Sequence, residues 1–169
     1  MVYLWLEYAR GFLEETQLLN YFSTSNSMTS IGKIGEKFVA QWLIHQGWQI
    51  LHERWRSPWG EIDLIAQQLD INIVIFVEVK TRKTRNWDQD GILAVTPQKQ
   101  AKIRQTADYF LGEYSQFSNF FCRFDVALVH HQPANHNFSK NSYSVIKIGQ
   151  PIQWGNYQLT LLDYIEAAF

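Results

Sequence analysis

Two carboxylates and a lysine stand at positions from which they could act together. Asp63 lies within one apolar segment, and Glu78 and Lys80 close the next. Strand side chains alternate between faces, so Glu78 and Lys80 would point the same way, and a hairpin partner can bring Asp63 beside Glu78. Oxygen ligands of this kind suit Mg²⁺ or Mn²⁺. The spacing favours a metal held by Asp63 and Glu78, with Lys80 orienting a water or stabilising negative charge during phosphodiester hydrolysis.

An ordinary structural role explains the same three residues. Glu78 and Lys80 can mark the point where a buried strand reaches solvent, and Asp63 can form an ion pair with Lys80. A carboxylate followed by carboxylate-x-lysine is a short pattern that arises often by chance. Other parts of the sequence must therefore decide between catalysis and structure.

Glu36 is a further candidate catalytic residue. It falls between Ala40 and Leu43 on a helical wheel, inside the apolar arc of a predicted helix over residues 32–46. A carboxylate on the core-facing arc needs a partner. A glutamate in the first helical turn, favoured by the helix dipole, is an equally good interpretation. Proximity to the strand cluster would separate the two.

Positive charge is concentrated directly after the carboxylate-x-lysine strand. Residues 81–104 hold six basic and two acidic side chains, a net charge of +4, whereas the whole chain carries −1. Phosphates flanking a scissile bond would lie here, and Trp87 could stack on a base. A solvated loop and a polar helix face are the alternative. The residues that we expect to contact nucleic acid are Arg82, Lys83, Arg85, Lys99 and Lys102.

The elements that must position these residues follow from periodicity and turn signals. We expect an antiparallel meander of three strands, a helix that crosses over to a strand parallel to the third, a further strand and a helical tail. A strand-helix-strand crossover favours parallel pairing, so the sheet would be mixed. The predicted α/β domain thus has a sheet of about five strands flanked by helices. The ranges are helix 32–46, strands 49–55, 61–67 and 73–80, helix 98–111, strands 124–129 and 143–148, and tail 159–169.

Length and composition set the frame for this domain. The chain has 169 residues, 46% of them hydrophobic. No apolar run is long enough for a membrane helix, and the single cysteine, Cys122, excludes an intrachain disulfide, so we expect a cytoplasmic protein. Residues 1–30 form a predicted extension with a polar linker, and residues 31–169 form a single domain.

Other polar residues receive structural interpretations. His130, His131 and His136 lack the paired spacing of zinc ligands, so we expect them on the surface. Asp125 opens a predicted strand and should pair with a basic neighbour, with a supporting role at the acidic site as the alternative.

Taken in order, these motifs resemble the YraN-like family of bacterial proteins. That family is similar to Holliday-junction-resolvase-type endonucleases of the PD-(D/E)xK superfamily. The resemblance covers residues 31–169, with two departures: Arg54 stands where the family usually has asparagine, and residues 1–27 have no recognised counterpart. It is carried by Gly35-Glu36, Gly60-Glu61-Ile62-Asp63-Leu64-Ile65, Phe76-Val77-Glu78-Val79-Lys80-Thr81-Arg82, Lys99, Arg123-Phe124-Asp125-Val126 and Ala168-Phe169.

The resemblance implies a restriction-endonuclease-like core. It also implies metal binding by Asp63 and Glu78, a catalytic lysine at Lys80 and a helix glutamate, Glu36, that approaches the metal. We therefore expect a Mg²⁺-dependent endonuclease-like protein acting on nucleic acid, with DNA as the substrate. A nucleic-acid-binding module that retains the nuclease fold without hydrolysis is the alternative. Resolvase-like relatives often form homodimers, which makes a second copy of this chain a candidate partner.

Overall fold

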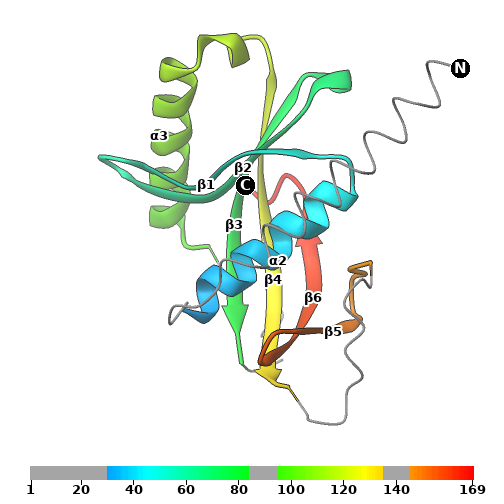
Figure 1. The fold of residues 1–169 in the computed structure, drawn as a ribbon. Coiled ribbons are helices and arrows are strands. Elements are labelled where there is room, and N and C mark those ends of the chain that lie inside the picture. The colour runs from blue at the N-terminus through cyan, green and yellow to red at the C-terminus, as the bar shows by residue number, and fades with distance from the viewer. Residues whose placement is uncertain (1–29, 84–94, 135–144) are drawn as a thin grey trace, which may run out of the picture. The chain divides into compact units, whose positions relative to one another are not determined.

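The computed structural model describes residues 30–83, 95–134 and 145–169 and contains a single six-stranded sheet there (Figure 1). Two helices, α2 (Ile31–His45) and α3 (Pro97–Glu113), and two short 3₁₀ turns, Leu69–Ile71 and Ser115–Phe117, accompany the sheet. The strands are β1 (Gln49–Ser57), β2 (Gly60–Gln68), β3 (Ile73–Arg82), β4 (Phe121–Pro133), β5 (Pro151–Trp154) and β6 (Tyr157–Ile165).

The sheet order is β1-β2-β3-β4-β6-β5, with β3 and β4 parallel and every other neighbouring pair antiparallel. The predicted meander of β1, β2 and β3 is therefore confirmed. The parallel pairing through the helical crossover is confirmed as well. Both features follow from chain lengths, because a tight turn permits only antiparallel pairing and a helix-length connection permits parallel pairing.

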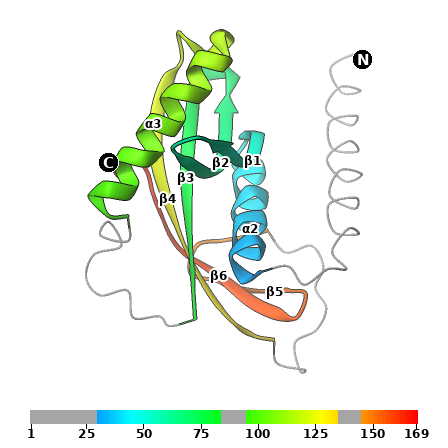
Figure 2. The same cartoon turned by 90° about the vertical axis from the view of Figure 1, so that its left-hand side faces the viewer.

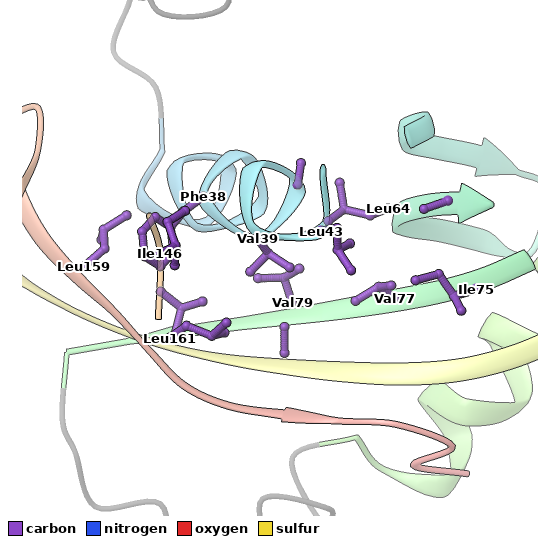
Figure 3. Packing of buried hydrophobic residues seen from close by; sticks show 14 residues of the cluster. Phe38, Val39, Leu43, Leu64, Ile75, Val77, Val79, Ile146, Leu159 and Leu161 are labelled. Atoms are coloured by element: carbon purple, nitrogen blue, oxygen red, sulfur yellow. The ribbon is translucent and has the colours of Figure 1, made fainter. Parts of the chain in front are cut away.

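Helices cover both faces of the central strands, as the apolar character of β3 requires (Figure 2). Val77 and Val79 pack with α2, where Val39 and Leu43 reach the sheet (Figure 3). Phe76 lies on the other face, against Phe110 of α3. A strand that is apolar at both parities is thus buried on both sides.

The ends of the helices follow local sequence signals. Gly47 adopts a φ of +86° just after α2, and the N–H of Trp48 bonds to the carbonyl of Leu43 at 3.0 Å. At the start of α3, the Thr96 hydroxyl accepts a hydrogen bond from the N–H of Lys99 at 3.3 Å. Pro97 is the first helical residue, and because proline lacks a backbone N–H it leaves no donor unpaired there. Lys99 is thereby fixed in the first turn of α3.

The C-terminal part differs from the prediction. The predicted helical tail over 159–169 is wrong, because β6 runs through Ile165 and pairs with both β4 and β5. Leu159 and Leu161 pack on the α2 side, but the pairing with β4 skips Leu162, and Leu162 and Ile165 pack on the α3 side. The apolar residues thus change face within the strand, and the simple alternation that distinguishes a strand from a helix is lost.

Two further expectations for this region are also wrong. Of the predicted strand 143–148, the described residues 145–148 are not strand, and the sheet gains β5 and β6 instead. His130 is buried rather than on the surface, because its Nε2 lies 3.0 Å from the carbonyl oxygen of Lys83. The predicted extension 1–30 lies outside the described residues except for Ser30, as does His136.

Neither helix in the described part of the chain is long and apolar enough to cross a membrane.

Candidate functional site

Asp63 lies where β2 separates from β3. The antiparallel pairing of the two strands runs from Gln68↔Ile73 to Leu64↔Val77 and stops one residue before Asp63. Beyond that point, the Asp63 Oδ2 atom accepts a hydrogen bond from the N–H of Val79 at 2.7 Å. A side-chain carboxylate thus supplies an acceptor to β3 where strand pairing has ended. This contact places Asp63 beside the Glu78 segment of β3.

Glu78 is buried and pairs with two lysines. Its Oε1 lies 2.7 Å from Lys80 Nζ, two residues along the same face of β3. Its Oε2 lies 3.1 Å from Lys99 Nζ, which reaches across from α3. The predicted common orientation of Glu78 and Lys80 is confirmed. Lys80 pairs with Glu78, whereas the carboxylate of Asp63 is held by the β3 backbone.

Asp63 and Glu78 are close enough for their charges to interact. Burial and the negative charge of Glu78 raise the pKa of Asp63 to about 7, although the Val79 hydrogen bond opposes this rise. The charge of Glu36 also raises this pKa, and Lys99 lowers it. At neutral pH Asp63 is therefore partly protonated. Any cation between the two carboxylates would favour its ionised form.

Glu36 approaches this cluster from α2. The helix begins at Ile31, so Glu36 lies beyond its first turn and the first-turn interpretation is wrong. The side chain is buried, and its Oε1 accepts a hydrogen bond from Arg54 Nη1 at 2.9 Å. Burial raises the pKa of Glu36, and Arg54 opposes that rise. Glu36 thus contributes to the field at Asp63, but its carboxylate is held by an arginine.

Gly35 explains how α2 comes this close to β3. A β-carbon on Gly35 would lie 2.0 Å from Thr81 Oγ1, closer than real contacts allow. The absence of a side chain at Gly35 therefore lets the backbone of α2 lie directly against Thr81. Thr81 follows Lys80 in the sequence, so this contact is next to the acidic cluster. Glu36 is placed near the cluster by this close approach.

Arg54 is a component of the site that was only marked as a departure in the sequence. Its φ is +53°, a left-handed conformation that asparagine adopts more readily than arginine. Its guanidinium joins two carboxylates, with Nη1 on Glu36 and Nη2 2.6 Å from Glu61 Oε1. In this chain, the position that suits asparagine therefore carries the cation that neutralises Glu36.

The predicted nucleic-acid contacts fall in three places. Lys99 is half-buried against Glu78, so it belongs to the acidic cluster as well as to the basic segment. Lys102 is exposed on α3, and Arg82 and Lys83 are exposed at the end of β3. Arg85 lies outside the described residues, as does Trp87.

Asp125 belongs to a separate buried network. It accepts hydrogen bonds from Arg123 Nε at 2.9 Å and Tyr164 Oη at 2.8 Å, and from the N–H of Ala167 at 3.0 Å. The expected basic neighbour is thus confirmed as Arg123, and the contacts tie β4 to the C-terminal segment. Burial and the charge of Asp125 raise the pKa of Tyr164. These groups hold the fold together and do not join the acidic cluster.

The donor set at the cluster fits a hard divalent cation held by two carboxylates. Among residues 30–83, 95–134 and 145–169, no group of three or more His, Cys, Asp and Glu side chains is arranged to hold a metal. Mg²⁺, however, is commonly bound through one or two carboxylates, with waters and substrate phosphates completing its octahedron. Glu78 Oε2 is buried without a hydrogen bond and lies 3.1 Å from Lys99 Nζ. Asp63 and Glu78 are therefore the residues that would hold the ion.

The six-stranded mixed sheet with a helix on each face is consistent with a restriction-endonuclease-like core. The model of the uncharacterised protein family UPF0102 matches residues 35–129, which include Glu36, Asp63, Glu78, Lys80 and Lys99. The chain belongs to this family.

Cyanobacterial relatives match most of the chain. A UPF0102 protein of Synechocystis is 49% identical over 148 residues, covering 84% of this chain and 99% of the relative. A relative from Acaryochloris marina is 45% identical over 153 residues, covering 82% and 89%. One from Nostoc is 45% identical over 146 residues, covering 85% and 96%. The similarity thus extends over nearly the whole length of these proteins.

Proposed function

We propose that this protein hydrolyses phosphodiester bonds in nucleic acid, with DNA as the principal substrate, in a reaction that requires Mg²⁺ or Mn²⁺. The observation that carries the proposal is the junction of Asp63 with β3, where its carboxylate bonds to Val79 N–H beside the buried Glu78. A buried carboxylate beside a second, half-buried one that repels it is a costly arrangement for stability alone. A divalent cation bound by both carboxylates would replace their repulsion with attraction to the ion.

The residues of the cluster divide the chemistry between them. Asp63 and Glu78 would hold the ion, which when bound polarises a phosphoryl oxygen and lowers the pKa of a water. Lys80, 2.7 Å from Glu78, is placed to orient that water or to stabilise charge on the phosphate. Glu36, paired with Arg54, adds its charge to the electrostatic potential at Asp63 from the α2 side.

One observation favours the alternative of a binding module without catalysis. Glu78 already has two cationic neighbours, Lys80 at 2.7 Å and Lys99 at 3.1 Å. The site is therefore charge-compensated by the protein itself, and such a cluster can persist without metal. In that case nucleic acid would bind equally well in the presence of a chelator.

A cleavage assay tests the proposal directly. Single-stranded, duplex and four-way-junction DNA are incubated with the protein in Mg²⁺ or in chelator, alongside Asp63→Asn and Lys80→Met. Asparagine keeps an acceptor for Val79 N–H, so Asp63→Asn removes the charge with little change to the strand junction. We expect metal-dependent cleavage that falls at least ~100-fold in both variants and is retained in Lys147→Met, a control at an exposed lysine outside the cluster. Cleavage that persists in both site variants would refute the assignment.

A further inference from the structure

One face of α3 leads away from the acidic cluster. Lys99, Lys102, Thr106 and Tyr109 are spaced three or four residues apart, which places them on one side of the helix. Lys99 is at the cluster end, with its Nζ 3.1 Å from Glu78 Oε2. Ten residues of helix rise by about 15 Å, so Tyr109 stands a few nucleotides from the site.

The tip of the β1-β2 hairpin lies along the same face. Figure 1 shows the hairpin reaching α3. Ser57 Oγ lies 3.0 Å from Thr106 Oγ1, and a β-carbon on Gly60 would lie 4.0 Å from the Cβ of Lys102. These contacts hold the turn against the middle of the helix. The hairpin that carries Asp63 therefore also borders the lysine face of α3.

Two aromatic rings are exposed at the far end of this face. Trp59 is 44% exposed and Tyr109 is 38% exposed, and their ring centroids are 5.3 Å apart. Trp55 supports them from beneath, with its ring 5.8 Å from Tyr109 and 5.4 Å from the buried Phe110. A hydrogen bond to Glu113 holds the Tyr109 hydroxyl and raises the pKa of that tyrosine. The two rings thus pack against each other and remain partly open to solvent.

We propose that Lys99, Lys102, Trp59 and Tyr109 form a track that binds unpaired nucleotides next to the acidic cluster. Lysines attract phosphates, and aromatic faces stack on bases of any sequence once those bases are free. Bases inside a continuous duplex are already stacked on one another and cannot use such a platform. The preferred substrate therefore contains single-stranded or locally unpaired nucleotides beside the bond that is cut. This inference rests on the proposed function and specifies its substrate class.

Binding measurements in chelator test the track without cleavage. The full chain is titrated against a fluorescently labelled mixed-sequence single-stranded DNA and against the same sequence as a blunt duplex. Base stacking on an aromatic side chain contributes about 1–3 kcal/mol, so Trp59→Ala should weaken single-strand binding by about 5- to 150-fold. Duplex binding should change less than twofold. Trp59→Phe, which keeps a ring, should restore most of the affinity and shows that a loss is not due to misfolding.

Matched controls separate the track from general effects. Phe121 is an aromatic residue with 76% exposure at the start of β4, so Phe121→Ala should leave binding unchanged. Lys102→Met should reduce the slope of log affinity against log salt by about 0.7 on single strands, whereas Lys147→Met should not. Equal losses on duplex and single strand, or no loss in Trp59→Ala, would overturn the track.

The two proposals fail in different ways. Binding that depends on Trp59 without any metal-dependent cleavage would refute hydrolysis and support the track. Cleavage that depends on Asp63, with binding indifferent to Trp59 and Lys102, would support hydrolysis and refute the track.

Discussion

The Asp63 carboxylate accepts a hydrogen bond from the N–H of Val79 at 2.7 Å. A side chain of β2 thus bonds to the backbone of β3 just beyond the last paired residues, Leu64 and Val77. This contact brings a second, half-buried carboxylate beside the buried Glu78. The charge that results is compensated on one side by Lys80 and Lys99 and on the other by Arg54. The strand junction is therefore the feature from which the chemistry of this site follows.

We predict that Asp63 lowers the stability of the fold as pH rises from about 4 to about 7. Its pKa is about 7 in the folded protein and 3.8 as a free side chain, so the folded state holds the proton more tightly in this window. The stabilisation is fully present below the lower pKa and is lost as pH passes the higher one. Asp63→Asn should therefore gain stability relative to wild type across this window, by at most about 4 kcal/mol.

Thermal melts of both proteins in chelator, from pH 4 to pH 8.5, measure this difference. Asp163→Asn provides the matched control, because Asp163 is an exposed carboxylate on β6. A constant difference in Tm between Asp63→Asn and wild type across the range would contradict the prediction.

Substitution of Gly35 by alanine should destabilise the domain. The new β-carbon would meet Thr81 Oγ1 at 2.0 Å and Thr81 Cβ at 3.1 Å, so α2 must move away from β3. Overpacking of this kind costs about 1–3 kcal/mol, measured as a reduced urea midpoint. Thr81→Ala in the same chain removes the closest atom and should recover part of the loss.

The control for this substitution lies in the same helix. Gly32 has no atom within 4 Å of its added β-carbon, so Gly32→Ala should be neutral or stabilising. If Gly35→Ala behaved like Gly32→Ala, the close approach of α2 to Thr81 would be wrong.

Loss of Arg54 should leave Glu36 buried without its cation. Arg54→Ala should raise the pKa of Glu36 further, because burial already raises this pKa and Arg54 opposes the rise. Stability at pH 8 should fall by about 1–3 kcal/mol, and Glu36→Gln in the same chain should restore most of it.

Carboxyl NMR titration and urea melts measure these two effects. Arg56→Ala removes a more exposed arginine that pairs with Glu61 at 2.7 Å, and it should cost less than ~1 kcal/mol. Equal costs for Arg54→Ala and Arg56→Ala would show that Glu36 does not depend on Arg54.

The sequence predicted the parts of the fold in which pattern and geometry agree. Alternation and turn signals defined β1, β2 and β3, and the helical crossover gave the parallel pairing of β3 with β4. The positions of Glu78 and Lys80 followed from the period of a strand. The tail was mistaken for a helix because the register of β6 shifts at Leu162, which interrupts the alternation of its apolar residues.

Contacts between distant segments could not be predicted in the same way. Nothing local indicates that Lys99 reaches Glu78 from another element, or that Arg54 joins Glu36 to Glu61. Glu36 was open to two interpretations because a helical wheel shows a direction but not what lies there. In the structure α2 begins at Ile31, which puts Glu36 beyond the first turn and excludes the helix-dipole interpretation.

Titration with Mn²⁺ at pH 8, followed by isothermal calorimetry, tests the central claim most directly. The account predicts one saturable site in wild type that is lost in both Asp63→Asn and Glu78→Gln. Glu36→Gln should keep the site, because Arg54 already holds the carboxylate of Glu36. An absence of binding in wild type, or binding of equal affinity in Asp63→Asn and Glu78→Gln, would contradict it.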